Sequence, residues 1–277
     1  MVRAAAVNGK VIVVTGGARG IGYATAKTLH ELGGRVAIGD IDEAAVKEAG
    51  TDLDVGFYAR LDVTDRQSFT TFLDDAEREL GPIDVLVNNA GICPAGRFVD
   101  EPDEVTRRTI AINTFGVILG TKLAAERMLK RGKGHIINIA SVAAVNAVPG
   151  VATYCATKHA VLGYTDTARL ELRDTGVTLS AVMPTLTNTS MIDGVASMPG
   201  LRNAEPEDIA AGIVSLIAKP KPRLVVTRAV GALIAVTRRM PLRIGEAVSR
   251  VLRADTLFAE AADKQERRDY EDRARHS

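Results

Sequence analysis

The chain is poor in cysteine. Cys93 and Cys155 are the only two cysteines among its 277 residues. Two cysteines cannot build a disulfide framework, and so low a content is typical of proteins from a reducing compartment. We interpret Cys155 as a packed thiol rather than a nucleophile. The sequence therefore excludes the class of small disulfide-rich secreted proteins and predicts a cytoplasmic one.

An excess of charge of one sign is also missing. The 35 lysines and arginines nearly balance the 34 acidic residues, which leaves a net charge of +1. Domains that bind nucleic acids usually carry a marked basic excess, so we expect no nucleic-acid partner. Residues 1–8 are too short and too weakly apolar to act as a signal peptide, which again favours a cytoplasmic location.

Histidine is scarce and scattered. The chain has four histidines, at positions 30, 135, 159 and 276. None of them shows the spacing of metal ligands. We therefore expect no metal site.

The chain does contain a regular alternation of short apolar runs and helix-length amphipathic segments. Strand-like runs occupy residues 11–14, 35–39, 85–87, 136–139 and 179–182. Nearly continuous apolar strands separated by helices are typical of a parallel sheet with helices on both faces. Right-handed connections would make it a doubly wound α/β sheet with its ligand at the carboxyl ends of the strands. The length suits one large domain.

A glycine-rich turn follows the first strand, in the sequence TGGARGIG over residues 15–22. Gly16 can take the tight turn, Gly20 can let the backbone approach a pyrophosphate, and Gly22 can let the following helix pack close to the strand. Such a turn alone is as consistent with a plain turn as with a nucleotide site. The second strand ends at Asp40, about twenty residues beyond the glycines, where a carboxylate can bind a ribose diol. This favours a dinucleotide site.

Tyr154 and Lys158 stand four residues apart, which places them on one face of a helix. A free tyrosine has a pKa near 10, and a nearby ammonium would favour the phenolate and lower that pKa toward neutral. The pair is therefore suited to proton transfer. A tyrosine and a lysine at this spacing are, however, most often a solvated helix face, so the pair needs support from other motifs.

That support comes from the order of the motifs. The sequence over about residues 8 to 190 resembles the short-chain dehydrogenase/reductase family, whose members have a Rossmann fold. TGGARGIG resembles the family's T-G-x-x-x-G-x-G, and NNAG at residues 88–91 resembles its N-N-A-G. Asn113, Ser141, Tyr154 and Lys158 match the order of its catalytic tetrad. Taken singly, Ser141 could simply close a strand and Asn113 could be a buried helix amide.

The resemblance implies a set of roles. Tyr154 would be the acid/base, Lys158 would lower its pKa and bind the nicotinamide ribose, Ser141 would hold the substrate oxygen, and Asn113 would keep Lys158 in a water-linked proton relay. Asp62 would hold the adenine ring. The residues expected to contact the cofactor are Gly16, Arg19, Gly20, Ile21, Gly22, Asp40, Ile41, Asp62, Val63, Asn89, Ala90, Gly91, Tyr154, Lys158, Pro184, Thr187 and Thr189.

Two charges bear on the choice of cofactor. Asp40 would accept hydrogen bonds from the ribose hydroxyls of NAD and would repel the 2′-phosphate of NADP. Arg19 could attract such a phosphate, but Ile41 stands where a phosphate-binding arginine would be expected. The sequence predicts NAD, with NADP as the less favoured cofactor.

The substrate side is apolar. Residues 142–152 are rich in valine and alanine, and the family lines its substrate pocket with this segment, which suggests a hydrophobic secondary alcohol or ketone of steroid, retinoid or lipid type. Residues of about 186–204 are expected to form a substrate loop. Thr185 stands where the family usually has glycine, which puts the local backbone in question because threonine adopts a positive φ at higher cost.

The carboxy-terminal part departs from the family. We divide the chain into a catalytic domain over 1–218 and a last strand with a basic, apolar helical extension over 219–277 packed on it. Basic residues beside apolar ones over 219–253 are typical either of a helix face packed on the domain or a second subunit, or of association with an anionic membrane surface. The apolar part is too short to span a bilayer. Residues 259–277 are expected to form a solvated helix.

Three interpretations remain open. The favoured one is an NAD-dependent oxidoreductase that forms a homodimer or homotetramer through the helices of Asn113 and Tyr154. The alternatives are a non-catalytic dinucleotide-binding protein on the same fold and a protein peripheral to the inner membrane surface.

Overall fold

Seven parallel strands form the centre of the computed structural model, which describes residues 2–196, 202–227, 258 and 265–276. The spatial order of the strands is β3-β2-β1-β4-β5-β6-β7. Their bounds are β1 Val11–Thr15, β2 Arg35–Asp40, β3 Phe57–Arg60, β4 Val85–Asn88, β5 Gly134–Ile139, β6 Val177–Met183 and β7 Arg223–Val225. The predicted doubly wound parallel sheet is confirmed.

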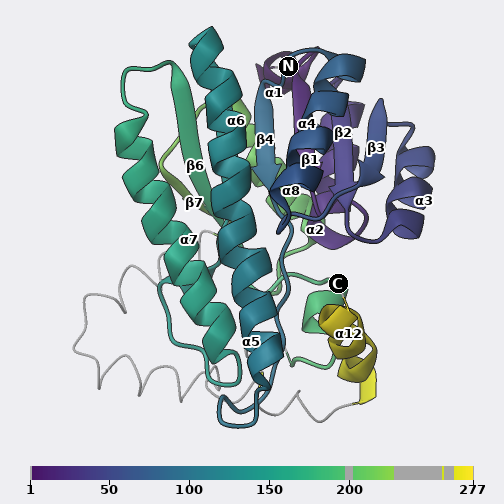
Figure 1. Cartoon of the computed structure of the whole chain (residues 1–277), viewed down its shortest axis with the longest axis vertical. Coiled ribbons are helices and arrows are strands. Elements are labelled where there is room, and N and C mark those ends of the chain that lie inside the picture. Colours follow the sequence, from purple (N-terminus) through teal and green to yellow (C-terminus); the bar gives the residue numbers. More distant parts are fainter. Residues whose placement is uncertain (1, 197–201, 228–257, 259–264, 277) are drawn as a thin grey trace.

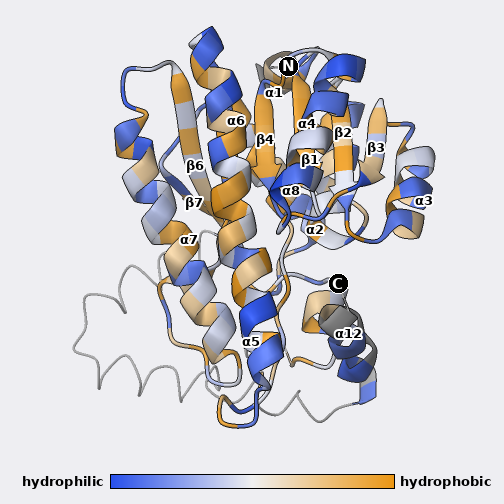
Figure 2. Ribbon diagram, viewed as in Figure 1, coloured by the Kyte–Doolittle hydropathy of each residue, from blue (hydrophilic) through white to orange (hydrophobic). Residues whose placement is uncertain are grey.

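Helices cover both faces of this sheet (Figure 1). One face carries α2, α3 and α8, and the other carries α4, α6 and α7. Figure 2 shows the strands mostly hydrophobic and the helices of mixed polarity, as two covered faces require. The helices are α1 Val2–Val7, α2 Gly20–Glu31, α3 Glu43–Leu53, α4 Arg66–Leu80, α5 Asp103–Ile110, the π-helix η1 Ala111–Gly116, α6 Val117–Arg131, η2 Val142–Ala144, α7 Ala152–Glu171, η3 Ser190–Ile192, α8 Pro206–Ala218 and α12 Gln265–His276.

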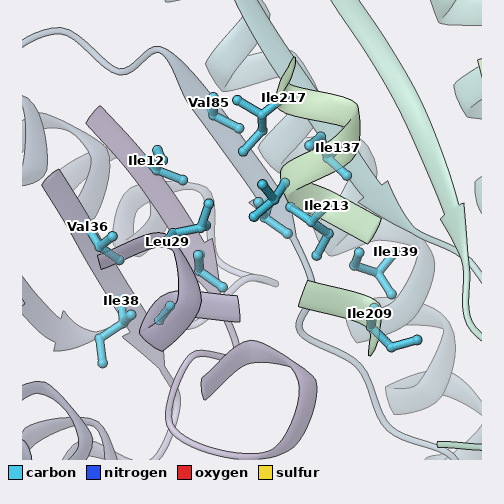
Figure 3. Packing of buried hydrophobic residues seen from close by; sticks show 14 of the residues in the cluster. Ile12, Leu29, Val36, Ile38, Val85, Ile137, Ile139, Ile209, Ile213 and Ile217 are labelled. Carbon is cyan, nitrogen blue, oxygen red and sulfur yellow. The ribbon is translucent and has the colours of Figure 1, made fainter. Parts of the chain in front are cut away.

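One hydrophobic core lies between the sheet and the α2/α8 pair. All five residues of β1 are buried. Leu29 of α2 and Ile213 of α8 face Ile12 and Ile137 of the sheet, and all four side chains are fully buried (Figure 3). Burying an aliphatic side chain of this size contributes about 1.5–3 kcal/mol, so this layer fixes α2 against the sheet.

The strand order creates a switch point. The chain runs outward from β1 through β2 to β3, then returns to β4 on the other side of β1 and runs outward again to β7. The loops that follow β1 and β4 therefore diverge at the carboxyl edge of the sheet, where open α/β sheets bind their ligands. The predicted site residues lie at this edge, in loops, at strand ends, near the starts of α2 and α7, and in the π-helix η1.

The expected solvated helix over 259–277 is wrong where it can be judged. Within α12, Arg267, Tyr270 and Ala274 are buried. Figure 1 draws α12 in yellow beyond the carboxyl ends of the strands, and its contacts are with the loops of that edge. The expected membrane-surface segment falls mostly on residues 228–253, which lie outside the described residues. Among the described residues no helix has the length and hydrophobicity that crossing a membrane requires.

Candidate active site

The glycine turn has the geometry that its sequence suggested. Gly16 has a φ of +64°, and a Cβ there would lie 2.8 Å from the Cα of Ala90. A Cβ at Gly22 would lie 1.9 Å from the carbonyl oxygen of Gly16. Gly20 has a φ of +54° and begins α2. Side chains are thus excluded at all three positions for backbone reasons, and Ile21 follows within the first turn of the helix.

The loop after β4 is tied to this turn. The hydroxyl of Thr15 accepts hydrogen bonds from the backbone N–H groups of Asn89 (3.0 Å) and Ala90 (3.1 Å). The side-chain amide of Asn89 donates to the carbonyl oxygens of Thr15 (2.9 Å) and Gly16 (3.0 Å). The structure therefore gives the Asn89 side chain the task of holding the glycine turn, and the sequence pattern did not reveal the part of the Thr15 hydroxyl.

Asp40 lies at the carboxyl end of β2, beside the glycine turn. Its carboxylate accepts hydrogen bonds from the backbone N–H groups of Ala18 and Asp42, each at 3.2 Å. Burial raises the pKa of Asp40, and these hydrogen bonds oppose the rise. Arg19 extends to Asp42, with which it forms a 2.6 Å ion pair. Ile41, the residue between Asp40 and Asp42, is partly buried. The one cation of the turn therefore already has an acidic partner.

The turn after β3 is stabilised by hydrogen bonds between its own residues. The carboxylate of Asp62 accepts from the backbone N–H (2.9 Å) and the hydroxyl (2.7 Å) of Thr64. Val63 is buried against η1, where a Cβ at Gly116 would come 2.9 Å from its Cγ2. This places Asp62 at the same edge of the sheet as Asp40.

Asn113 is brought into the site by a π-helix. Segment η1 interrupts the α-helical run between α5 and α6, and such π-bulges are frequent at functional sites. The amide of Asn113 donates to the carbonyl oxygen of Ile92 and accepts from the N–H of Ile92, both at 2.8 Å. A Cβ at Gly91 would lie 3.1 Å from Asn113 Oδ1 and 3.5 Å from Lys158 Nζ. Asn113 thus anchors the loop beside Lys158.

Lys158 is buried, with 4% of its surface exposed. Its ammonium donates to the carbonyl oxygen of Ile139 (2.9 Å), at the end of β5, and lies 5.6 Å from the centre of the Tyr154 ring. Burial lowers the pKa of Lys158 to about 8. The predicted pairing in space is present, with the ammonium over the ring rather than at the hydroxyl.

The prediction that the pKa of Tyr154 is lowered is wrong for the chain without a cofactor, because its pKa is raised. Burial raises the pKa of Tyr154, and a hydrogen bond with Ser141 lowers it by less. The physical reason is that desolvation disfavours the phenolate, while the Lys158 ammonium donates its hydrogen bond to the carbonyl oxygen of Ile139 and not to the phenol. Ser141 follows β5 and is the N-cap of η2, where its hydroxyl also accepts from the backbone N–H of Ala143 (3.1 Å). The structure brings Ser141, Tyr154 and Lys158 together.

The segment after β6 accommodates threonine without strain. Among the described residues only Asp54 and Asp174 are non-glycine residues with a positive φ, so Thr185 has an ordinary φ. Its hydroxyl bonds to that of Thr227 (2.9 Å), beyond β7. The doubt raised by the missing glycine is thereby removed.

The neighbours of Thr185 also face the site. The carbonyl oxygen of Pro184 accepts from Val142 N–H (3.0 Å), and the hydroxyl of Thr187 donates to the Thr185 carbonyl (2.8 Å). Thr189 lies near Gly20, where a Cβ would come 3.2 Å from its Cγ2. This segment therefore reaches from the Ser141 loop to the start of α2.

Apolar side chains from several loops gather around Tyr154. The buried members come from the loops after β4 and β5 and from α7, and Phe258 joins them from the carboxy-terminal part. Four partly buried members, Leu186, Met191, Ile192 and Val195, come from the segment after β6 that was predicted to be the substrate loop. The group comprises Cys93, Ala95, Ala143, Val148, Val151, Tyr154, Cys155, Leu186, Met191, Ile192, Val195 and Phe258. Burial raises the pKa of the Cys93 thiol to about 12, so this cysteine is a packing residue.

Sequence reasoning missed the side chains that α12 contributes. Arg267, Tyr270 and Glu271 contact the loop after β4, and Arg267 also contacts η3. An Arg/Glu pair at four residues usually indicates a solvated helix, and no periodic apolar stripe distinguishes this segment. In the part of the chain that the structure describes, no cluster of three or more His, Cys, Asp or Glu could hold a metal ion.

Comparison with known proteins identifies the family. Residues 10–199 match the family model described as short chain dehydrogenase. The chain belongs to the short-chain dehydrogenase family. It is 34% identical over 255 residues to the probable oxidoreductase EphD of Mycobacterium tuberculosis, an alignment that covers 83% of this chain and 43% of that protein. The chain thus matches less than half of the length of this relative.

Two further similarities cover most of this chain and of the protein that it matches. The chain is 35% identical over 213 residues to the 3-alpha-(or 20-beta)-hydroxysteroid dehydrogenase of Mycobacterium tuberculosis, covering 76% of this chain and 78% of that one. A short-chain dehydrogenase/reductase from Burkholderia phymatum, solved in complex with NAD, superposes with a TM-score of 0.76 at 25% identity, covering 83% of this chain and 93% of that one.

Proposed function

We propose that the protein is an NAD-dependent oxidoreductase that transfers a hydride between nicotinamide and a hydrophobic secondary alcohol or ketone. The observation that carries this proposal is the convergence of Ser141, Tyr154 and Lys158 beside Gly91, at the carboxyl edge that also holds the glycine turn. A phenol with a hydroxyl partner and a buried ammonium suits proton exchange with a carbinol oxygen.

The residues fit a dinucleotide. The turn excludes any Cβ at Gly16 and Gly22, so the backbone itself would face the diphosphate. Among the described residues no side chain caps the start of α2, which leaves first-turn N–H groups for an anion. The carboxylate of Asp40 would accept from the ribose hydroxyls, and Asp62 would hold the adenine end.

The chemistry divides between cofactor and chain. A bound nicotinamide would supply the hydride acceptor or donor. Tyr154 would take the proton of the substrate hydroxyl, or return it in the reverse direction, while Ser141 holds the same oxygen. Lys158, whose pKa of about 8 keeps it mostly charged at neutral pH, would stabilise the phenolate. Asn113 would keep the loop at Gly91 in place against both groups.

NAD is proposed over NADP because of the charges beside the turn. A 2′-phosphate would meet the carboxylates of Asp40 and Asp42, and Arg19 is engaged by Asp42. Like charges at close range are strongly unfavourable in a partly buried site. The NAD in the complex of the Burkholderia phymatum relative supports the same choice.

A hydrophobic substrate is proposed because the side chains around Tyr154 are apolar. The similarity to a hydroxysteroid dehydrogenase supports an alcohol of steroid, retinoid or lipid type. Dimers or tetramers are proposed through α5, η1, α6 and α7, whose exposed large apolar side chains are Ile110, Phe115, Leu129 and Leu170.

The direct test is a screen of secondary alcohols, steroids, retinoids and long-chain ketones that follows NADH absorbance. Tyr154→Phe is the matched control, because it removes only the hydroxyl. We expect the variant to lose about 10²–10⁴-fold in kcat, the usual contribution of a general acid or base. Wild-type activity retained in Tyr154→Phe would show that another group moves the proton.

A further inference from the structure

Side chains of helix α12 form hydrogen bonds with the backbone of the loop that follows β4. The hydroxyl of Tyr270 accepts from the backbone N–H of Cys93 (2.7 Å), and the carboxylate of Glu271 accepts from the N–H of Ala95 (3.0 Å). The guanidinium of Arg267 donates to the carbonyl oxygen of Cys93 (2.5 Å). Three side chains of one helix therefore satisfy three backbone groups of a loop about 175 residues earlier in the chain.

Arg267 also reaches the second loop of the site. Its Nη1 donates to the carbonyl oxygen of Met191 (2.9 Å) in η3, and its Nε donates to Glu271 (2.8 Å). Met191 belongs to the apolar group around Tyr154. One side chain thus joins the loop after β4 to the predicted substrate loop.

The burial of Arg267 is complete, with 0% of its surface exposed. A buried charge is costly unless it is paired and hydrogen-bonded. Here Glu271 balances the charge, both carbonyl oxygens accept from the fork, and the rings of Phe258 and Tyr270 lie 5.8 and 5.1 Å from its centre. Only a planar, multidentate donor can serve these acceptors together, which a lysine could not.

The two contacts of Arg267, with the carbonyl oxygens of Cys93 and Met191, form a clamp that lies close to the reacting groups. Cys93 is two residues beyond Gly91, where a Cβ would lie 3.5 Å from Lys158 Nζ, and Met191 belongs to the same apolar group as Tyr154. A shift of either loop would change the space between the phenol and the substrate loop. Loss of orientation in a site lowers the productive binding of substrate.

We propose that Arg267 is a positioning residue that fastens the substrate loop to the loop after β4 and thereby sets substrate affinity. The kinetic consequence rests on the proposed oxidoreductase function. The structural consequence does not, because the amides of Cys93 and Ala95 report directly on the contact with α12.

The first measurement is residue-resolved hydrogen exchange of the whole chain in Arg267→Ala. The matched control is Arg268→Ala, which removes the same charge from an exposed position of the same helix. We expect exchange at Cys93 and Ala95 to accelerate at least about tenfold in Arg267→Ala and to stay at the wild-type rate in Arg268→Ala. Unchanged exchange in Arg267→Ala would overturn the clamp, as would equal acceleration in the control.

The second measurement separates KM from kcat with the alcohol found by the substrate screen. Arg267→Ala should raise the substrate KM about tenfold or more while kcat and the KM for NAD change less than about threefold, and Arg267→Lys should recover part of the loss. A lowered substrate KM would mean that α12 obstructs the site, which contradicts the proposal. An equal rise in Arg268→Ala would contradict it too.

A fold control keeps the test decisive. If Arg267→Ala is unfolded by circular dichroism, Glu271→Gln replaces it, since the amide keeps the shape of the side chain and removes the charge that balances Arg267. Faster exchange at Cys93, whose N–H is bound by Tyr270 and not by Glu271, with the core helices unchanged supports the clamp, and wild-type exchange at Cys93 overturns it. If the wild-type enzyme oxidises no alcohol, the proposed function fails while the exchange data still decide the clamp.

Discussion

The nucleotide side and the substrate side of the candidate site lie at one edge of the sheet but are held by different means. The glycine turn takes its shape from its own backbone, because Gly16 has a positive φ and Gly22 leaves no room for a Cβ, and the Asn89 side chain of the adjacent loop holds that shape. The loops at Cys93 and Met191 are fixed by side chains of α12 from the far end of the chain. A local motif can therefore be recognised in sequence, whereas a long-range clamp cannot.

The largest expected effect concerns Gly22. Gly22→Ala would place a methyl group 1.9 Å from the Gly16 carbonyl oxygen, a distance that forces the turn apart. We expect NAD affinity, measured by calorimetry, to fall at least about a hundredfold, roughly 2.7 kcal/mol. Gly163→Ala on α7 is the matched control, because a Cβ there meets nothing within 4 Å, and it should raise stability by up to about 1 kcal/mol. Normal NAD affinity in Gly22→Ala would refute the rigid-turn account.

A second effect sharpens the charge argument on the nucleotide side. Asp40→Ala combined with Asp42→Ser removes both carboxylates and releases Arg19, while serine preserves the cap of α3. We expect the NADP-to-NAD ratio of kcat/KM to rise about 10–100-fold. This is the size of the repulsion between a phosphate and one or two nearby carboxylates when solvent screens the charges. Glu43→Gln, an exposed acid of the same helix, should leave the ratio unchanged. A ratio unaffected by the double variant would remove the basis for the predicted NAD preference.

A third effect tests whether the substrate side sacrifices stability for function. Burial lowers the pKa of Lys158 from 10.5 to about 8, so between these pH values the folded chain binds fewer protons than the unfolded chain. The loss of folding stability caused by burying the charged Lys158 is therefore complete below about pH 8, and it disappears as the pH rises toward 10.5. Lys158→Met should be inactive yet more stable at pH 7 by about 2–4 kcal/mol, given 1.36 kcal/mol per pKa unit.

Denaturant unfolding of wild type and Lys158→Met at several pH values between 7 and 10 checks this. Comparing the two proteins at each pH cancels the shared contributions of Tyr154 and Cys93, whose raised pKa values act in the opposite sense. The advantage of the variant should shrink as the pH rises. A constant difference would mean that the charge of Lys158 is not what costs stability.

The smallest expected effect concerns Thr185, the departure from the family pattern. Because Thr185 has an ordinary φ and bonds to Thr227, Thr185→Gly should lower stability by about 1 kcal/mol or slightly more and change kcat/KM little. Thr227→Val, which removes only the partner hydroxyl, should lower stability by a similar amount. A gain in stability with glycine would show that threonine strains this turn.

Much of the site could be predicted because it is local. The TGGARGIG turn, the carboxylate at Asp40 and the four-residue spacing of Tyr154 and Lys158 each depend on short-range geometry, and the structure places all of them at one edge of the sheet. The direction of the Tyr154 pKa was mispredicted because it depends on how much protein surrounds the phenol and on where Lys158 directs its proton. Spacing along a helix contains neither quantity.

The sequence by itself determined the parallel sheet and the residue types that meet at its carboxyl edge, because hydrophobic periodicity and glycine conformation act within a few residues. The tertiary structure alone decided the partners of Asn113, the ordinary φ of Thr185 and the burial of Arg267, which belongs to α12, a helix of polar composition (Figure 2). These depend on contacts between segments far apart in the chain, and a buried cation becomes tolerable only where distant carbonyl groups and an acid converge on it.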